Sequence, residues 1–136
     1  MPQAAPAKRR ILIVDDHPLV RRGLTALINA ESDLIVCAEA ANCSEGLEAI
    51  AGARPDLAVV DLSFRDGDGF DLVRAICATQ GGPPVLALTM HDAPLHVRRA
   101  FAAGASGYVA KREMTDTLLT AIRSLLRGET FGAPGS

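Results

Sequence analysis

Residues 10–16, with the sequence RILIVDD, decide the fold, because four consecutive aliphatic residues lead directly into two aspartates. Continuous aliphatic runs of this length are typical of parallel strands that are buried on both faces. Three further runs have the same form: DLAVVD at 56–61, VLALT at 85–89 and ASGYVAK at 105–111. These runs end on Asp61, Thr89 and Lys111. The sequence therefore predicts an open parallel sheet with reactive side chains at the carboxyl ends of its strands, where such sheets bind ligands.

Strand and helix patterns alternate five times along the chain. A further strand is expected at residues 34–40, and helices after Asp16, at 43–53, after Asp68, at 93–103 and around 118–126. Asn42, followed three residues later by Glu45, resembles a capping box that opens the second helix. We expect an α/β fold, a flavodoxin-like, doubly wound, five-stranded parallel sheet of order 2-1-3-4-5 with five helices. The predicted boundaries are a disordered N-terminal tail at 1–9, one domain at 10–128, and a tail or the start of a linker at 129–136.

Composition excludes several classes of protein. The net charge of −2 gives no polycationic face, which argues against DNA or RNA binding by this chain alone. The three cysteines, Cys37, Cys43 and Cys77, have no CxxC spacing, so we expect small core residues and neither a disulfide framework nor a zinc site. No apolar run approaches the length of a membrane span or a secretory signal. A soluble cytoplasmic protein, with no membrane association, is the expectation.

Three carboxylates at adjacent strand ends predict a cation site. Asp15, Asp16 and Asp61 would repel one another by roughly 3–4 kcal/mol per pair at 4–5 Å and an effective dielectric near 20. Ligands that are all oxygen favour Mg²⁺, with Mn²⁺ as the alternative. A carboxylate beside such an ion can act as a nucleophile towards phosphorus. Thr89 and Lys111 are the hydroxyl and ammonium groups available to hold the new phosphoryl oxygens.

These residues resemble, in type, order and spacing, the receiver domain of bacterial two-component response regulators. The matching positions are Asp15-Asp16, Asp61, Thr89 and Lys111, the last within GASGYVAK at residues 104–111. The resemblance covers about Arg10 to Gly128 and is closest to receivers that precede DNA-binding domains of the LuxR/NarL type. It implies a signalling module, a phosphorylation-dependent switch, and not a metabolic enzyme.

The resemblance also implies a role for each position. Asp61 would be the phosphoacceptor for a sensor histidine kinase. Asp16, Asp61 and the backbone carbonyl of Ser63 would bind Mg²⁺ directly, with Asp15 acting mainly through water. Thr89 and Lys111 would contact the phosphoryl group. Tyr108 matches the switch aromatic, whose ring moves inward when the threonine hydroxyl turns towards phosphate.

Two departures from the family pattern lie close to these positions. Arg65 stands where receivers commonly have a proline, which predicts a less rigid loop beside the acceptor with extra charge. Lys111 is followed by Arg112 and not by the proline of many receivers. Neither departure removes a required group.

Other interpretations stay open. A haloacid-dehalogenase-type Mg²⁺-dependent phosphatase also uses an aspartate nucleophile, but it needs an acidic residue two positions after the acceptor, where this chain has Ser63. A flavodoxin-like flavin domain would need hydroxyl-rich phosphate loops and stacking aromatics, which this chain lacks. Within the receiver interpretation, the chain is either a stand-alone phosphorelay receiver or a fragment ahead of an output domain that controls transcription.

The remaining expectations concern the helices and single residues. The helix at 93–103 has few large apolar residues and should be the least firmly anchored. The last helix carries an apolar stripe, part of which could serve a phosphorylation-dependent homodimer: Leu118, Leu119, Ile122, Leu125 and Leu126. Asp66 and Asp68 are interpreted as loop and cap residues. We interpret three histidines as surface or loop residues: His17, His91 and His96. Four arginines are interpreted as solvated faces of the first and fourth helices: Arg21, Arg22, Arg98 and Arg99.

Overall fold

The computed structural model describes residues 7–62, 69–90 and 94–132. The five strands are parallel and lie in the order β2-β1-β3-β4-β5, which confirms the predicted fold. The elements are β1 (Arg9–Val14), α1 (Pro18–Asn29), β2 (Leu34–Ala40), α2 (Cys43–Ala53), β3 (Leu57–Asp61), α3 (Gly69–Ala78), β4 (Val85–Thr89), α4 (Pro94–Ala102), β5 (Gly107–Ala110), the 3₁₀ turn η1 (Lys111–Glu113) and α5 (Met114–Leu126). The first strand begins at Arg9, one residue earlier than expected; residues 1–6 of the expected tail lie outside the described residues.

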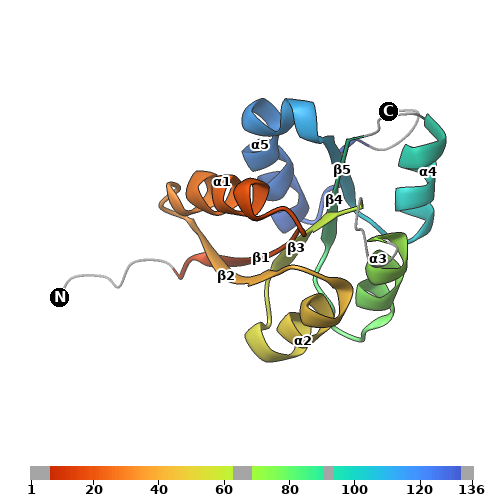
Figure 1. Ribbon diagram of the computed structural model, residues 1–136, viewed down its shortest axis with the longest axis horizontal. Helices are drawn as coiled ribbons and strands as arrows, with labels where there is room; N and C mark the ends of the chain where they lie inside the picture. The colour runs from red at the N-terminus through yellow and green to blue at the C-terminus, as the bar shows by residue number, and fades with distance from the viewer. Residues whose placement is uncertain (1–6, 63–68, 91–93, 133–136) are drawn as a thin grey trace.

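Helices cover both faces of the sheet, with α1 and α5 on one face and α2, α3 and α4 on the other (Figure 1). Alternate residues of one strand serve the two cores. Ile11 and Ile13 of β1 pack with α1 and α5, whereas Leu12 and Val14 pack on the opposite side. All four are fully buried, as expected for a parallel strand between two helical layers.

Local signals in the sequence account for two of the helix starts. Pro18 occupies the first turn of α1, where its missing N–H costs no helical hydrogen bond. At α2 the predicted capping box is present: the backbone N–H of Glu45 donates to the Asn42 side chain at 2.8 Å. The Glu45 carboxylate in turn accepts from the backbone N–H of Ala41 at 3.0 Å. The first contact satisfies a donor that the helix start leaves without an intrahelical partner, and the second fixes the residue that precedes the N-cap.

The helices nearest the β5 edge differ in how firmly they are held. Within α4, Ala100 is the single fully buried residue, so this helix is the least anchored, as the sequence predicts. In α5 the residues Leu118, Ile122 and Leu125 are fully buried, and Leu119 and Leu126 are partly buried against the same core. The apolar stripe of α5 therefore packs on its own sheet and supplies no exposed apolar face.

One expectation about the cysteines is wrong. Cys77 is exposed at the end of α3, where its thiol donates to the carbonyl of Gly104, and Cys37 and Cys43 are only partly buried. Burial still raises the pKa of the Cys37 and Cys77 thiols above the ordinary value. Among the described residues, no helix has the length and apolar character needed to cross a membrane.

Candidate functional site

The three predicted carboxylates meet at the carboxyl ends of β1 and β3. Asp61 is the last residue of β3, and Asp15 and Asp16 follow directly after β1, which lies beside β3 in the sheet. Asp15 and Asp61 are fully buried, and the side chain of Asp16 is 14% exposed. Adjacent parallel strands bring their carboxyl ends to one edge, which is why positions 45 residues apart in the sequence converge.

The ammonium group of Lys111 lies between two of these carboxylates. Its Nζ is 3.1 Å from Oδ2 of Asp61 and 3.3 Å from Oδ2 of Asp15, and its side chain is only 8% exposed. Lys111 reaches this position because it follows β5 directly, at the start of η1. The Lys111 ammonium, which has little contact with solvent, offsets part of the repulsion between Asp15 and Asp61. It can also bind a further anion at this site.

Thr89 and Tyr108 lie on the neighbouring strands β4 and β5. Thr89 ends β4 beside Ala110, and Tyr108 pairs with Ala87 in the same register. Thr89 is fully buried and Tyr108 is 7% exposed, within the core beneath α3 and α4. Both predicted switch residues therefore occupy buried positions, Thr89 on the strand next to the acceptor strand β3 and Tyr108 on the edge strand β5 beyond it.

His17 lies in the loop between β1 and α1 with its side chain 44% exposed, as expected, but it also belongs to this cluster, which the sequence did not indicate. Its Nδ1 lies 2.9 Å from Oδ1 of Asp16, 3.1 Å from Oδ1 of Asp15 and 3.8 Å from Oδ2 of Asp61. The backbone N–H of His17 also donates to Oδ1 of Asp15 at 2.8 Å, closing a tight turn after β1. The signal in the sequence was its position directly after Asp16.

Arg21 is a second residue whose role the sequence did not indicate. Its guanidinium donates to the backbone carbonyl of Asp15 at 2.7 Å and lies 3.4 Å from the Glu39 carboxylate. The side chain thus holds the turn that carries Asp15 and Asp16 against α1. It is one helical turn beyond His17, whose carbonyl accepts from the Arg21 N–H.

The side chains present fit a hard divalent cation. Asp15, Asp16, His17 and Asp61 each offer a ligand atom, and these atoms lie within 4.8 Å of one another. Oδ2 of Asp15 is buried and accepts no hydrogen bond within the described part of the chain, where it forms an ion pair with the Lys111 ammonium at 3.3 Å. Carboxylate oxygens in such a cluster are the ligands that Mg²⁺ and Mn²⁺ prefer. The expected fourth oxygen, the Ser63 carbonyl, lies outside the described residues, as do Arg65, Asp66, Asp68 and His91.

An aromatic contact joins α3 to α4 beside the site. The Phe70 ring meets His96 edge to face at 5.0 Å, and the Arg99 guanidinium lies 4.1 Å from the Phe70 ring centroid. His96 is partly exposed and Arg99 is exposed, as the surface interpretation of both predicted, but their contact with Phe70 was not foreseen. Because Phe70 is 3% exposed, the contact gives the weakly anchored α4 a fixed point on α3.

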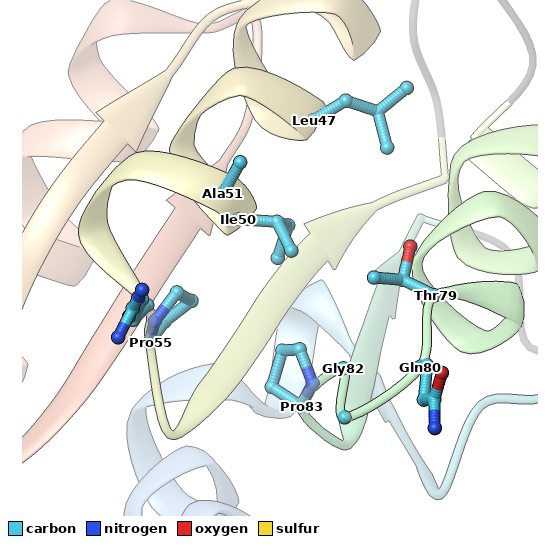
Figure 2. Close-up of a pocket in the computed structure, with 10 residues that line it drawn as sticks. Leu47, Ile50, Ala51, Pro55, Thr79, Gln80, Gly82 and Pro83 are labelled. Carbon is cyan, nitrogen blue, oxygen red and sulfur yellow. The ribbon is translucent and has the colours of Figure 1, made fainter.

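A surface pocket of about 610 Å³ lies at the other pole of the molecule, between α2 and the α3–β4 connection. Figure 2 shows its lining, with Leu47, Ile50 and Ala51 of α2 facing Thr79, Gln80 and Pro83. The one titratable side chain in its lining is Arg54. This pocket lacks the carboxylates, hydroxyl and ammonium of the cluster, so the candidate site is the cluster at the strand ends.

Comparison with known sequences agrees with this geometry. The sequence profile described as the response regulator receiver domain matches residues 11–123. The chain is 33% identical over 91% of its length to a nitrate/nitrite response regulator protein homolog of Haemophilus influenzae, and covers 60% of that protein. It is 36% identical over 90% of its length to the DNA-binding transcriptional activator DevR/DosR of Mycobacterium tuberculosis, and covers 56% of it. The chain thus spans little more than half the length of these relatives.

Solved structures give the same result. A two-component response regulator of the LuxR family from Aurantimonas sp. superposes with a TM-score of 0.87 at 37% identity, over 94% of this chain and 91% of that one. The signal receiver domain of the putative response regulator NarL from Mycobacterium tuberculosis gives a TM-score of 0.86 at 29% identity, over 91% of this chain and 100% of that one. The chain belongs to the response regulator receiver domain family, the signalling domains of two-component systems.

Proposed function

We propose that this chain is a phosphorylation-dependent switch in which Asp61 accepts a phosphoryl group from a sensor histidine kinase. The observation that supports this most directly is the surrounding of Asp61: a buried carboxylate at a strand end, with an ammonium at 3.1 Å and two further carboxylates beside it. The phosphatase alternative has no support from the family match, and Ser63 offers no acid at the required position.

The transfer step needs a nucleophile and a leaving group. A carboxylate oxygen of Asp61 attacks the phosphorus of a phosphohistidine, the P–N bond breaks, and the released imidazole takes a proton from solvent. The product is an acyl phosphate on Asp61. Mg²⁺ held by Asp15, Asp16 and Asp61 would neutralise charge on the phosphoryl oxygens. The Lys111 ammonium would bind the negatively charged phosphoryl oxygens, since a point charge binds phosphate oxygens without directional constraint.

Two residues would transmit the effect of phosphorylation from Asp61 to the surface. The Thr89 hydroxyl turns towards the new oxygens, which changes the space beside Tyr108 on the neighbouring strand. Tyr108 would exchange between the buried position of this structure and a more exposed one, and phosphorylation would favour the buried one. α4 is the element most able to respond, because only Ala100 anchors it fully.

The partners of the proposed switch follow from the same resemblance. A sensor histidine kinase supplies the phosphoryl group, and the output is control of transcription through a DNA-binding domain. Phosphorylation would promote a homodimer, although the α5 stripe that was the candidate interface is covered by its own sheet. Sedimentation of phosphorylated protein as a pure monomer at high micromolar concentration would contradict dimerisation.

Chemical phosphorylation tests the proposal without the cognate kinase. Incubation with phosphoramidate and Mg²⁺ should produce one acid-labile phosphoryl group, which peptide mapping after borohydride reduction should place at Asp61. A phosphoryl group at a serine or histidine, or none at all, would contradict the proposed function. Removing divalent cations with a chelator should stop the reaction, because the incoming phosphoryl oxygens would then face three carboxylates.

A further inference from the structure

The chain does not leave the domain freely after α5. The end of α5 is closed by two hydrogen bonds, from Gly128 N–H to the Leu125 carbonyl and from Glu129 N–H to the Ser124 carbonyl, both at 3.0 Å. Gly128 has a φ of 83°, a conformation that glycine adopts without steric cost. The chain therefore reverses and runs back along the outer edge of β5. We call residues 129–132 the exit segment.

The exit segment pairs with β5 through a single parallel β-bridge between Phe131 and Gly107. Phe131 N–H donates to the Ser106 carbonyl at 3.1 Å, and Tyr108 N–H donates to the Phe131 carbonyl at 3.0 Å. The Phe131 side chain is partly buried against the core beneath α5. An edge strand exposes a row of backbone donors and acceptors, and here Phe131 satisfies two of them on either side of Gly107.

Gly132 brings the exit segment into close contact with Tyr108. Its φ is 76°, and a Cβ at this position would lie only 2.7 Å from the Tyr108 carbonyl oxygen. The backbone of Tyr108 is thus held on both sides, by Ala87 of β4 and by the exit segment. A change in the backbone at Tyr108 must displace Phe131 and Gly132, and the reverse also holds.

We propose that the exit segment is a positioning element for Tyr108, so that the docking of this segment on β5 is coupled to the state of the switch residue. This inference rests on the proposed switch role of Tyr108. Coupling of this kind is reciprocal: if the exit segment favours one position of Tyr108, phosphorylation that favours a position of Tyr108 must alter the docking of the exit segment. Phe131 and Gly132 act through Tyr108 and do not touch the phosphoryl site.

The test compares two glycines that share a conformation but differ in their surroundings. Gly132→Ala places a methyl group against the Tyr108 carbonyl, whereas Gly81→Ala imposes the same strain at a φ of 74° with no atom within 4 Å. In Gly132→Ala this clash should weaken the two hydrogen bonds between Phe131 and β5. Amide exchange at Tyr108 and Phe131, measured by NMR, should then be about tenfold faster. Gly81→Ala should leave both rates unchanged. Phe131→Ser, which removes the buried ring, should act as Gly132→Ala does.

A second measurement distinguishes an exit segment that positions Tyr108 from one that only covers the edge of β5. Tyr108 is the single tyrosine of a chain without tryptophan, so its fluorescence reports one site. Phosphorylation should change this fluorescence in the wild type and in Gly81→Ala, and should change it much less in Gly132→Ala at the same phosphoryl content. Wild-type exchange rates in both Gly132→Ala and Phe131→Ser, or faster exchange with a full fluorescence response, would overturn the proposal. If Asp61 takes no phosphoryl group, the proposed function fails, and the exchange rates still decide whether the segment is docked.

Discussion

The Nζ atom of Lys111 lies 3.1 Å from Oδ2 of Asp61. Opposite unit charges at this distance attract by about 5 kcal/mol at an effective dielectric of 20. The same ammonium is 3.3 Å from Asp15, so it holds together two buried carboxylates that would otherwise repel each other. This relationship links the stability of the domain to the chemistry proposed for it, because a bound cation and a phosphoryl group would both act on the same charges.

Lys111→Met should therefore destabilise the domain most when divalent cations are absent. Removing one member of a buried ionic cluster costs on the order of 3 kcal/mol, since the remaining carboxylates lose their counter-charge. Mg²⁺ should restore part of the lost free energy of unfolding, and should stabilise the variant more than the wild type. Urea unfolding with and without Mg²⁺ measures this, with Lys111→Arg as the charge-preserving control. An equal loss under both conditions would contradict the link between Lys111 and the cation site.

Thr89→Ala should separate phosphorylation from the response to it. Asp61 keeps its carboxylate, its ammonium partner and its neighbouring aspartates, so the variant should still accept a phosphoryl group. Without the hydroxyl, the conformational change of Tyr108 and α4 on phosphorylation should be smaller. Amide NMR shifts on phosphorylation, followed across residues 94–110, report this directly. Shifts equal to those of the wild type would show that Thr89 does not carry the coupling.

Stability at acid pH should depend on the contact between Asp33 and Arg123. The hydrogen bond from Arg123 lowers the pKa of Asp33 below its ordinary value of 3.8. A carboxylate with a lowered pKa stabilises the fold above its unfolded pKa and loses that contribution as pH falls through the folded pKa. The difference in free energy of unfolding between wild type and Asp33→Asn should thus be constant near neutrality and shrink as the pH drops below about 3.8. A difference that stays constant throughout would contradict the assignment.

Arg123→Met supplies the control for this pH dependence. Arg123 binds both Asp33 at 2.9 Å and Glu31 at 2.7 Å, and so ties α5 to the connection between α1 and β2. Once Arg123 is absent, Asp33→Asn should no longer alter the pH dependence of stability. A double-mutant cycle measured at neutral and acid pH makes this comparison.

Local patterns in the sequence predicted more of the fold than of the contacts between its elements. The aliphatic runs and the Asn42–Glu45 box act over a few residues, so the strands and the start of α2 followed from them. The strand order was predicted from the general topology of doubly wound α/β sheets, and the structure confirms it. The positions of Asp15, Asp61, Thr89 and Lys111 followed as well, because the ends of parallel strands meet at one edge.

Contacts that depend on three-dimensional packing were missed. His17 was interpreted as a surface or loop residue because the three histidines show no metal-ligand spacing on a common face. It does lie in a loop, but the tight turn after β1 brings its ring to the carboxylates. Arg99 on Phe70 and Phe131 on β5 join segments that no local periodicity relates. Such contacts depend on how the helices and the exit segment pack against the sheet, which no short stretch of sequence determines.

DNA should not bind to this chain alone, even though a DNA-binding activator is among its relatives. The net charge is −2 and the five helices all pack on the sheet, so no recognition helix is available within the described residues. Fluorescence anisotropy with labelled DNA at physiological salt should show no sequence-specific binding at micromolar protein. Saturable, sequence-specific binding would place an output function inside the receiver.

Asp61→Asn decides whether Asp61 is the phosphoacceptor. The substitution keeps the size of the side chain and removes the nucleophilic charge, while Asp71→Asn changes an exposed carboxylate on α3 and serves as the control. After incubation with phosphoramidate and Mg²⁺, intact mass spectrometry should show one added phosphoryl group on the wild type and on Asp71→Asn, and none on Asp61→Asn. Equal phosphorylation of Asp61→Asn and the wild type would contradict the claim.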